Sequence, residues 1–491
     1  MRLSLKKSLQ ITCALAAMTT FNFANVHAMP IQSDFYKPTI QTNNNLYSSY
    51  LQSKNWQDNT KNTLNEFLQT YGKNSANYNS EVKPYAVFDF DNTTSIMDAE
   101  EQLCIWQLNH LAFAVTPEKL SEVLKTGIPK EKLNLTYGAD NGSGNQVKII
   151  DVIDDAVKAY SNLYKKGYVS STGKELDNTV KQSDDFKEFT SKMRWLYDAI
   201  SDNMDTSISY PWVTYWYTGM TPQEVYNIAY ASDAYYSDPQ KGQTWSIEYY
   251  TGPENYKSKA GSVKVAYNQG LTVSPEIKEL YAALDKNGID TWVNSASQID
   301  VIRAAVDYFQ IPGVDGIVAM TSKLDKNGKY INEYNYDLHA QTQGVGKSLT
   351  IDKVIAPKYN GHGPIFAAMD SQGDFNFCTE YKDTKAVLIL NRVRTDDAAL
   401  CAGIAQYQEE NHIGLKEANL TGNTKYILQG RNENTGTLWN NYETLRLGKK
   451  DTSYLSDKAQ NVIKQLNAGK SIHDVLQENT SLKDYQGYKT R

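Results

Sequence analysis

The chain has 491 residues, a formal net charge of −6 and 40% hydrophobic residues. This length can bury a large core and allows about two to four units of ordinary domain size. The acidic balance argues against nucleic acid as a partner.

Residues 1–28 resemble a secretory signal: basic residues come first, an apolar segment follows at 11–18, and Ala28 ends a cleavage site. Removal of its three basic residues changes the net charge from −6 to −9. No later apolar run reaches the ~20 residues of a membrane span. We therefore expect an exported protein, periplasmic or secreted, without a membrane span. Three cysteines remain, which allows one disulfide at most, and Cys378 with Cys401 is the favoured pair.

The predicted elements begin with an amphipathic helix at 56–71. The apolar run Ala86-Val87-Phe88 then predicts a buried strand that ends in the turn residues Asp91-Asn92-Thr93-Thr94. The long region 97–281 predicts mainly helices, at 98–112, 151–164, 184–200 and 221–231. From 275 onward the pattern predicts helices at 275–286, 299–309 and 347–355, and strands at 291–294, 330–336, 364–369 and 385–390. The tail from 411 is polar and predicts one helix, at 455–466.

Helices that alternate with short apolar strands predict an α/β fold with a doubly wound parallel sheet. The region 97–281 would be a large helical cap inserted after the first strand, over the carboxyl edge of the sheet. The expected organisation is a signal peptide (1–28), an N-terminal helical segment with the first core strand (29–96), the cap (97–281), the remainder of the core (282–410) and a C-terminal extension (411–491).

Asp89 and Asp91 follow the first strand directly and are one residue apart. Alternation along a strand would point both side chains to the same side, at the carboxyl end where open α/β sheets form their sites. One carboxylate can attack an electrophile while the other handles the proton of the leaving group. The alternative is a calcium loop of the helix-loop-helix type, but Thr94 occupies the sixth position, where such a loop needs glycine.

Four groups of polar residues fall at the ends of predicted strands or at a helix start. They are Asp89 with Asp91, Ser295, Lys347, and Asp370 with Asp374. A serine hydroxyl and a lysine ammonium can hold phosphoryl oxygens, and carboxylates can hold a hard divalent cation. Two like charges about 4 Å apart repel by ~4 kcal/mol at an effective dielectric of 20, so the cluster indicates a metal ion, with Mg²⁺ the default candidate.

Taken singly, these residues also have plain structural explanations. Ser295 fits a turn hydroxyl, Lys347 fits a solvated charge at a helix start, and the two later aspartates fit helix caps. Lys353 and Lys358 compete with Lys347 for the lysine role. Joint occurrence of all four groups in this order favours the catalytic interpretation.

In order and spacing the motifs resemble those of the haloacid dehalogenase superfamily of phosphohydrolases. They are Asp89-Phe90-Asp91-Asn92-Thr93, Ser295 after an apolar strand, Gly346-Lys347, and Asp370-Ser371-Gln372-Gly373-Asp374. The resemblance covers roughly residues 84–392, with the cap between the first and second motifs. It implies a metal-dependent phosphomonoesterase that acts on a small-molecule phosphate ester.

The same resemblance assigns roles to individual residues. Asp89 would be the nucleophile that forms an aspartyl-phosphate, and Asp91 would protonate the leaving alcohol and later activate water. Thr93 would orient the loop, and Ser295 and Lys347 would bind the phosphoryl group. The metal ligands would be Asp89, the Asp91 backbone carbonyl and Asp370, with Asp374 in support.

The beginning of the cap carries three acidic residues near the mouth of this site: Asp98, Glu100 and Glu101. Asp98 falls where the similar phosphoserine phosphatases carry an acidic residue for the substrate ammonium. An aromatic cluster in the same cap includes Trp212, Tyr215 and Trp216, and aromatic faces bind quaternary ammonium groups.

With the export signal and the segment 429–436, these features resemble the bacterial phosphorylcholine phosphatases, which implies a small cationic phosphate ester as substrate. Core packing is the alternative role of the aromatic cluster, and solvated helix positions are the alternative for the two glutamates. The functional alternatives are a broad-specificity exported acid phosphatase, and an envelope ligand-binding protein with residual turnover.

Overall fold

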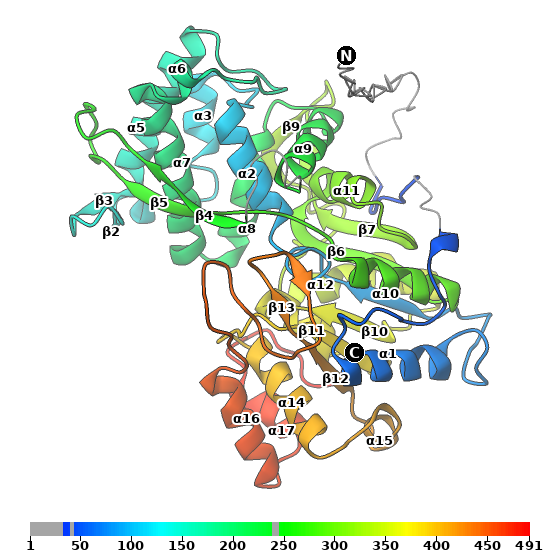
Figure 1. The fold of residues 1–491 in the computed structure, drawn as a ribbon. Helices are drawn as coiled ribbons and strands as arrows, with labels where there is room; N and C mark the ends of the chain where they lie inside the picture. Colours follow the sequence, from blue (N-terminus) through cyan, green and yellow to red (C-terminus); the bar gives the residue numbers. More distant parts are fainter. Residues whose placement is uncertain (1–32, 40–43, 238–244) are drawn as a thin grey trace, which may run out of the picture. The chain divides into compact units, whose positions relative to one another are not determined.

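The computed structural model describes residues 33–39, 44–237 and 245–491 (Figure 1). Asp34–Arg491 form one compact unit. The expected signal peptide, 1–28, lies outside the described residues. None of the helices in the described ranges combines the length and the apolar character that crossing a membrane requires.

A six-stranded parallel sheet forms the centre of this unit (Figure 1). Its strands, in spatial order, are β12 (Lys425–Gln429), β11 (Ala386–Leu390), β10 (Phe366–Met369), β1 (Tyr85–Phe88), β6 (Asp290–Gln298) and β7 (Val314–Met320). From β1 the chain builds β6 and β7 on one side and then β10, β11 and β12 on the other. The winding therefore reverses at β1, where such sheets open a crevice at their carboxyl edge. The predicted doubly wound parallel sheet is confirmed.

Alternate residues of β1 enter two different hydrophobic clusters, because successive side chains of a strand point to opposite faces. Ala86 and Phe88 pack in one cluster with side chains of α1 (Asp58–Tyr71), α10 (Pro275–Lys286) and α11 (Ile299–Tyr308). Tyr85 and Val87 pack in the other with side chains of α13 (Phe375–Thr379), α14 (Ala398–Glu410) and α16 (Asp457–Asn467). Both faces of the sheet are thus covered by helices, and only its edges remain for polar chemistry.

The insertion between β1 and β6 is mainly helical, as predicted (Figure 1). It contains α2 (Ala99–His110), α3 (Pro117–Val123), α4 (Lys130–Leu133), α5 (Ile149–Lys165), α6 (Asn178–Lys181), α7 (Asp184–Asn203), α8 (Thr206–Thr214) and α9 (Pro222–Tyr236). Two antiparallel hairpins join them, β2 (Thr136–Gly138) with β3 (Gln146–Lys148), and β4 (Ser246–Thr251) with β5 (Lys264–Gln269). A reciprocal capping box between Thr221 and Glu224 fixes the start of α9.

Two strands of the sheet were not predicted. β7 lies on the edge beside β6, and β12 lies inside the region predicted as a C-terminal extension, so the sheet continues beyond residue 410. The apolar pattern that predicts a buried strand is interrupted in β12, because the strand begins with Lys425 and ends with Gln429. Both polar side chains are buried and hydrogen-bonded, Lys425 to Ile413 O and Gln429 to the carbonyls of Gly430 and Trp439.

Further elements lie outside the central sheet and the cap. β8 (Ser322–Leu324) pairs with β9 (Tyr330–Tyr334), so the edge strand predicted at 330–336 belongs to a separate small sheet. α12 (Val345–Thr350) precedes β10; β13 (Arg431–Asn432), β14 (Thr437–Leu438), α15 (Leu415–Leu420) and α17 (Ile472–Asn479) lie in the C-terminal region.

The favoured disulfide is wrong, because Cys378 and Cys401 are free thiols, as is Cys104. All three side chains are buried. Cys378 and Cys401 belong to the hydrophobic cluster that covers one face of the sheet. They act there as small apolar residues.

Candidate active site

The turn after β1 places Asp89 and Asp91 at the carboxyl edge of the sheet. The Asp89 amide still donates to the Ala368 carbonyl of β10, so this residue continues the strand ladder. Thr94 then folds the chain back, because its hydroxyl donates to the Asp89 carbonyl at 2.7 Å and its amide donates to the Phe90 carbonyl at 2.8 Å. Asn92 adopts a left-handed conformation with φ of 65°, which a non-glycine residue rarely does. We call residues 89–97 the catalytic turn, after the role predicted from the sequence for Asp89 and Asp91.

Lys347 of α12 reaches into this turn from a distant part of the chain. Its ammonium donates to Asp89 Oδ1 at 2.5 Å and to Asp374 Oδ1 at 2.6 Å, and all three side chains are buried. Burial works against a charged lysine, but Asp374 and Asp89 raise the pKa of Lys347 above its usual value. Burial and the neighbouring Asp374 raise the pKa of Asp89 well above its usual value, against the opposing effect of Lys347. The lysine therefore compensates part of a dense negative charge.

Three carboxylates in this cluster have the arrangement of a metal site. Oxygens of Asp89, Asp370 and Asp374 lie within 4.8 Å of one another, and all three residues are buried. Thr93 donates its hydroxyl to both Asp89 and Asp370 at 3.1 Å, which ties the catalytic turn to the loop after β10. Hard oxygen donors from separate side chains suit Mg²⁺ or another hard divalent ion.

Asp91 is held by donors from β6 and α2. The Ser297 hydroxyl donates to Asp91 Oδ2 at 2.5 Å, while the Ser295 hydroxyl lies at 3.5 Å from the same oxygen. The Ala99 amide donates to the other oxygen at 2.7 Å. Burial and the charge of Asp98 raise the pKa of Asp91 well above its usual value. Its carboxyl group is therefore fixed in direction and is biased toward the protonated form.

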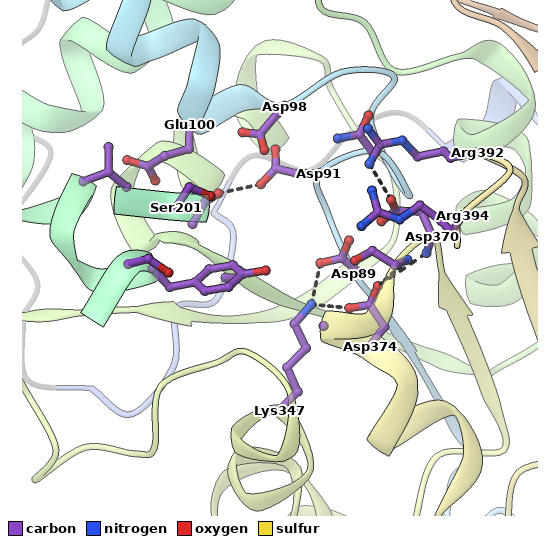
Figure 2. A pocket seen from close by; sticks show the side chains of 18 of the residues that line it. Asp89, Asp91, Asp98, Glu100, Ser201, Lys347, Asp370, Asp374, Arg392 and Arg394 are labelled. Carbon is purple, nitrogen blue, oxygen red and sulfur yellow. Dashed lines mark hydrogen bonds and ion pairs between the residues drawn. The ribbon is translucent and has the colours of Figure 1, made fainter. Parts of the chain in front are cut away.

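A cavity of about 250 Å³ opens over these residues, between the sheet edge and the cap (Figure 2). Asp89, Asp91, Lys347, Asp370 and Asp374 line its floor. The cap contributes Asp98, Glu100, Tyr197, Ser201, Ser209, Tyr210, Trp212 and Val213. This size suits a small ligand, and the cap supplies most of the groups that could contact a part of the ligand away from the aspartates.

Only some of the residues predicted to contact a cationic group line this cavity. Asp98, Glu100 and Trp212 do, whereas Glu101, Tyr215 and Trp216 do not. Glu101 follows Glu100 on α2 and therefore points in another direction, where it pairs with Arg194 of α7 at 2.7 Å.

The two aromatic residues outside the cavity belong to the interior of the cap. Trp216 packs edge-on against Trp212 with ring centroids 5.5 Å apart, and Tyr215 is buried beside it. Core packing, the alternative role of this cluster, holds for both of them.

The acidic residues on the cap side of the cavity have raised pKa values. Burial raises the pKa of Glu100 to about 7, although Tyr217 and the Gln298 amide both donate hydrogen bonds to this carboxylate. Burial and the charge of Glu101 raise the pKa of Asp98 to about 6, while its Oδ1 caps α2 by accepting from the Glu101 amide. Both groups therefore gain their negative charge near neutral pH.

Several lining residues were missed by the sequence reasoning. Ser297 lines the cavity and makes the shorter contact with Asp91, while Ser295 is fully buried beneath it. The two-residue spacing of these serines on one strand was the available signal. Arg392 and Arg394, which follow β11, also line the cavity, and Arg392 donates to Asp370 Oδ2 at 2.8 Å (Figure 2). Only their position after a predicted strand pointed to them.

Comparison with known proteins finds similarity at the level of structure. No protein-family model matches the chain, and no curated protein matches it. The crystal structure of a conserved functionally unknown protein from Anaerococcus prevotii DSM 20548 is 26% identical, and the match covers 83% of this chain and 100% of that chain, with a TM-score of 0.68.

Two further crystal structures align with TM-scores below 0.5. A protein with unknown function from Bordetella pertussis Tohama I is 10% identical over 70% of this chain and 98% of that chain, with a TM-score of 0.33. A phosphoserine phosphohydrolase-like protein from Francisella tularensis subsp. tularensis SCHU S4 is 12% identical over 62% and 87%, with a TM-score of 0.24. The fold is thus shared with the Anaerococcus protein over 83% of this chain.

Proposed function

We propose that the protein is a phosphomonoester hydrolase of the haloacid dehalogenase superfamily that forms an aspartyl-phosphate at Asp89. One observation carries this proposal: Asp89, Asp91, Lys347, Asp370 and Asp374 come from three separate regions of the chain and meet on the floor of one cavity. Chance would rarely assemble a lysine with four carboxylates at the switch point of a doubly wound sheet.

The reaction follows from the placement of two carboxyl groups. An Asp89 oxygen attacks the phosphorus atom, and the bond between phosphorus and the ester oxygen breaks. The leaving alkoxide takes a proton from Asp91, which Ser297 and the Ala99 amide hold in a fixed direction. Water then attacks the aspartyl-phosphate, Asp91 accepts a proton from that water, and inorganic phosphate leaves while Asp89 is restored.

The donor set fits a hard divalent cation, and Mg²⁺ is the proposed ion. Asp89, Asp370 and Asp374, with the Asp91 backbone carbonyl, would hold it. When bound, it offsets the negative charge that the phosphoryl group adds to the cluster. Lys347 contributes a second positive charge, and the hydroxyls of Thr93 and of Ser295 or Ser297 orient the groups that meet the phosphoryl oxygens.

For the substrate we propose a small cationic ester, with phosphorylcholine as the first candidate. Asp98 and Glu100 line the cavity from the cap, and Tyr210 and Trp212 are among the aromatic residues that line it with them. Carboxylates and aromatic faces together attract a quaternary ammonium group. Export to the periplasm or outside the cell, proposed from residues 1–28, is consistent with such a substrate.

A broad-specificity phosphatase is the second candidate. Its support is the mixed charge of the cavity, since Arg392 and Arg394 line it as well as Asp98 and Glu100. A cavity lined by both basic and acidic side chains does not select strictly for a cationic substrate.

A panel of four phosphate esters tests both candidates. Phosphate release from choline phosphate, ethanolamine phosphate, phosphoserine and glycerol phosphate is measured with Mg²⁺ and with EDTA. We expect turnover that requires Mg²⁺, a preference for choline phosphate, and loss of turnover in Asp89→Asn and in Asp91→Asn while circular dichroism stays unchanged. Equal rates for all four esters would favour broad specificity. Near-normal turnover in Asp89→Asn would refute the hydrolase mechanism.

A further inference from the structure

A series of charged side chains, all of them buried except the partly exposed Arg392, joins the catalytic turn to the loop after β10. Arg431 of β13 donates from Nη1 to the Asn92 carbonyl at 2.7 Å and from Nη2 to Asn92 Oδ1 at 2.9 Å. Glu433 accepts from the same guanidinium at 3.1 and 2.6 Å. The Nε atom of Arg392 lies 4.0 Å from Glu433, and its Nη1 donates to Asp370 at 2.8 Å. Both loops that carry the acidic cluster are therefore linked to the C-terminal region.

Within this series of contacts, Asn92 is the residue that belongs to the catalytic turn. It lies between Asp91 and Thr93 and has a φ of 65°, a left-handed conformation that asparagine adopts more readily than most other non-glycine residues. Arg431 donates hydrogen bonds both to the backbone carbonyl and to the side-chain oxygen of Asn92. The planar guanidinium has a fixed fork geometry, so the two bonds set the orientation of the residue as well as its position.

Arg431 and Glu433 are both buried, and their opposite charges compensate each other. Arg431 is 0% exposed, and a buried cation needs a partner to compensate for the loss of water. Burial alone would raise the pKa of Glu433, but Arg431 and Arg392 lower it to about 2. The Leu447 amide donates to the second oxygen of Glu433 at 3.1 Å, which anchors the carboxylate in the C-terminal region.

We infer that Arg431 and Glu433 are positioning residues that hold the catalytic turn in its working geometry through Asn92. The C-terminal region after β12 is then a required part of the active site. Arg431 and Glu433 do not line the cavity. They act on the reaction only through the residues they hold. The inference rests on the proposed function, because turnover of a phosphate ester is one of its two measurements.

Arg431→Met and Arg431→Lys test the inference, with Arg303→Met as the matched control. Arg303 pairs with the buried Asp300 and does not line the cavity. Arg431→Met removes the guanidinium that donates both hydrogen bonds to Asn92. The catalytic turn can then shift, and displacement of reacting groups by about 1 Å can lower the rate ~10²-fold. We expect kcat to fall by about that factor, with KM near the wild-type value, and wild-type kcat in the control. Arg431→Lys, which keeps the charge beside Glu433, should give a smaller fall.

A measurement without substrate or metal accompanies the kinetics. Hydrogen–deuterium exchange of the peptide covering residues 88–98 should be faster in the Arg431 variants than in the wild type and the control. If Arg431→Met does not fold, Arg431→Lys carries the test alone. Wild-type kcat and unchanged exchange in Arg431→Lys would overturn the inference, as would an equal fall of kcat in the Arg303→Met control.

A double-mutant cycle with Asn92→Gly identifies the route of the effect. Glycine keeps the positive φ but removes Oδ1, one of the two acceptors of Arg431. Arg431→Lys should therefore lower kcat less in the Asn92→Gly background than in the wild type, and full additivity would contradict an action through Asn92. The two hypotheses can be refuted separately. If the Asp89→Asn variant is active, the proposed mechanism is wrong. If Asp89→Asn is inactive but the Arg431 variants behave as the wild type, only this inference is wrong.

Discussion

The ammonium of Lys347 lies 2.5 Å from Asp89 Oδ1, although 258 positions separate the two residues in the chain. A second bond, to Asp374, places the same ammonium between the two aspartates. A single cation thereby compensates two buried carboxylates that would otherwise repel each other. This contact connects the β1 edge, α12 and the loop after β10 in one site.

Lys347→Met should reduce both activity and stability. Loss of one preorganised positive group typically lowers kcat by ~10²–10³-fold, and removal of one partner of a buried ion pair costs ~3–5 kcal/mol of unfolding free energy. Steady-state kinetics and urea unfolding measure the two effects. Lys353→Met is the control, because Lys353 is exposed and its ammonium donates to the Asp337 carbonyl at 3.1 Å. Comparable losses in the two variants would contradict a special role for Lys347.

Ser297→Ala should impair turnover more than Ser295→Ala. The Ser297 hydroxyl makes the 2.5 Å bond to Asp91 and lines the cavity, whereas Ser295 lies at 3.5 Å and is buried. A hydrogen bond contributes ~0.5–1.5 kcal/mol when both partners are neutral and ~1.5–3 kcal/mol when one is charged, so we expect kcat to fall by about 2- to 100-fold in Ser297→Ala. A larger effect of Ser295→Ala would restore the role expected from the sequence.

Glu100→Gln should raise KM for choline phosphate more than for glycerol phosphate, because the Glu100 carboxyl group lines the cavity. Glu101→Gln is the matched comparison one residue along α2. Its carboxylate pairs with Arg194 outside the cavity, so it should lower stability and leave the KM ratio unchanged. A KM effect of Glu101→Gln confined to cationic esters would contradict this arrangement.

Glu100 should also make the stability of the fold depend on pH. Burial raises its pKa from 4.5 to about 7, so the folded state binds the proton more tightly than the unfolded state does. The contribution of Glu100 is therefore greatest below pH 4.5 and is lost as the pH rises through about 7, by about 3 kcal/mol in total. Urea unfolding of wild type and Glu100→Gln between pH 4 and 8 measures the difference. Parallel curves would show that the carboxyl group titrates normally.

Local patterns predicted much of the fold because they record which faces of an element are buried. The helix predicted at 275–286 is α10, and the strand predicted from Ala86 to Phe88 is β1. β12 was missed because its two terminal polar residues find buried partners that lie elsewhere in the chain. A pattern search cannot detect such partners, since they are not neighbours in sequence.

The residue types in the sequence indicated the kind of chemistry expected of the site. They did not indicate which of these residues lie together in the folded protein. Asp89 and Asp91 both line the cavity, although both follow the end of β1 and strand alternation does not extend to them. Glu100 and Glu101 are adjacent and equally acidic, and only the rotation of α2 decides that one enters the cavity and the other meets Arg194. Arg431 gave no local sign of its contact with Asn92, 339 positions away.

By itself, the sequence determined the periodic elements, the order of the aspartate, serine and lysine motifs, and the class of fold, because burial patterns and turn chemistry act over a few residues. Only the tertiary structure decided which serine makes the shorter hydrogen bond to Asp91 and which cap residues line the cavity. It also decided that the C-terminal region contacts the catalytic turn. These outcomes depend on side chains brought together by the packing of the whole unit, and contact energies of that kind leave no trace in local spacing.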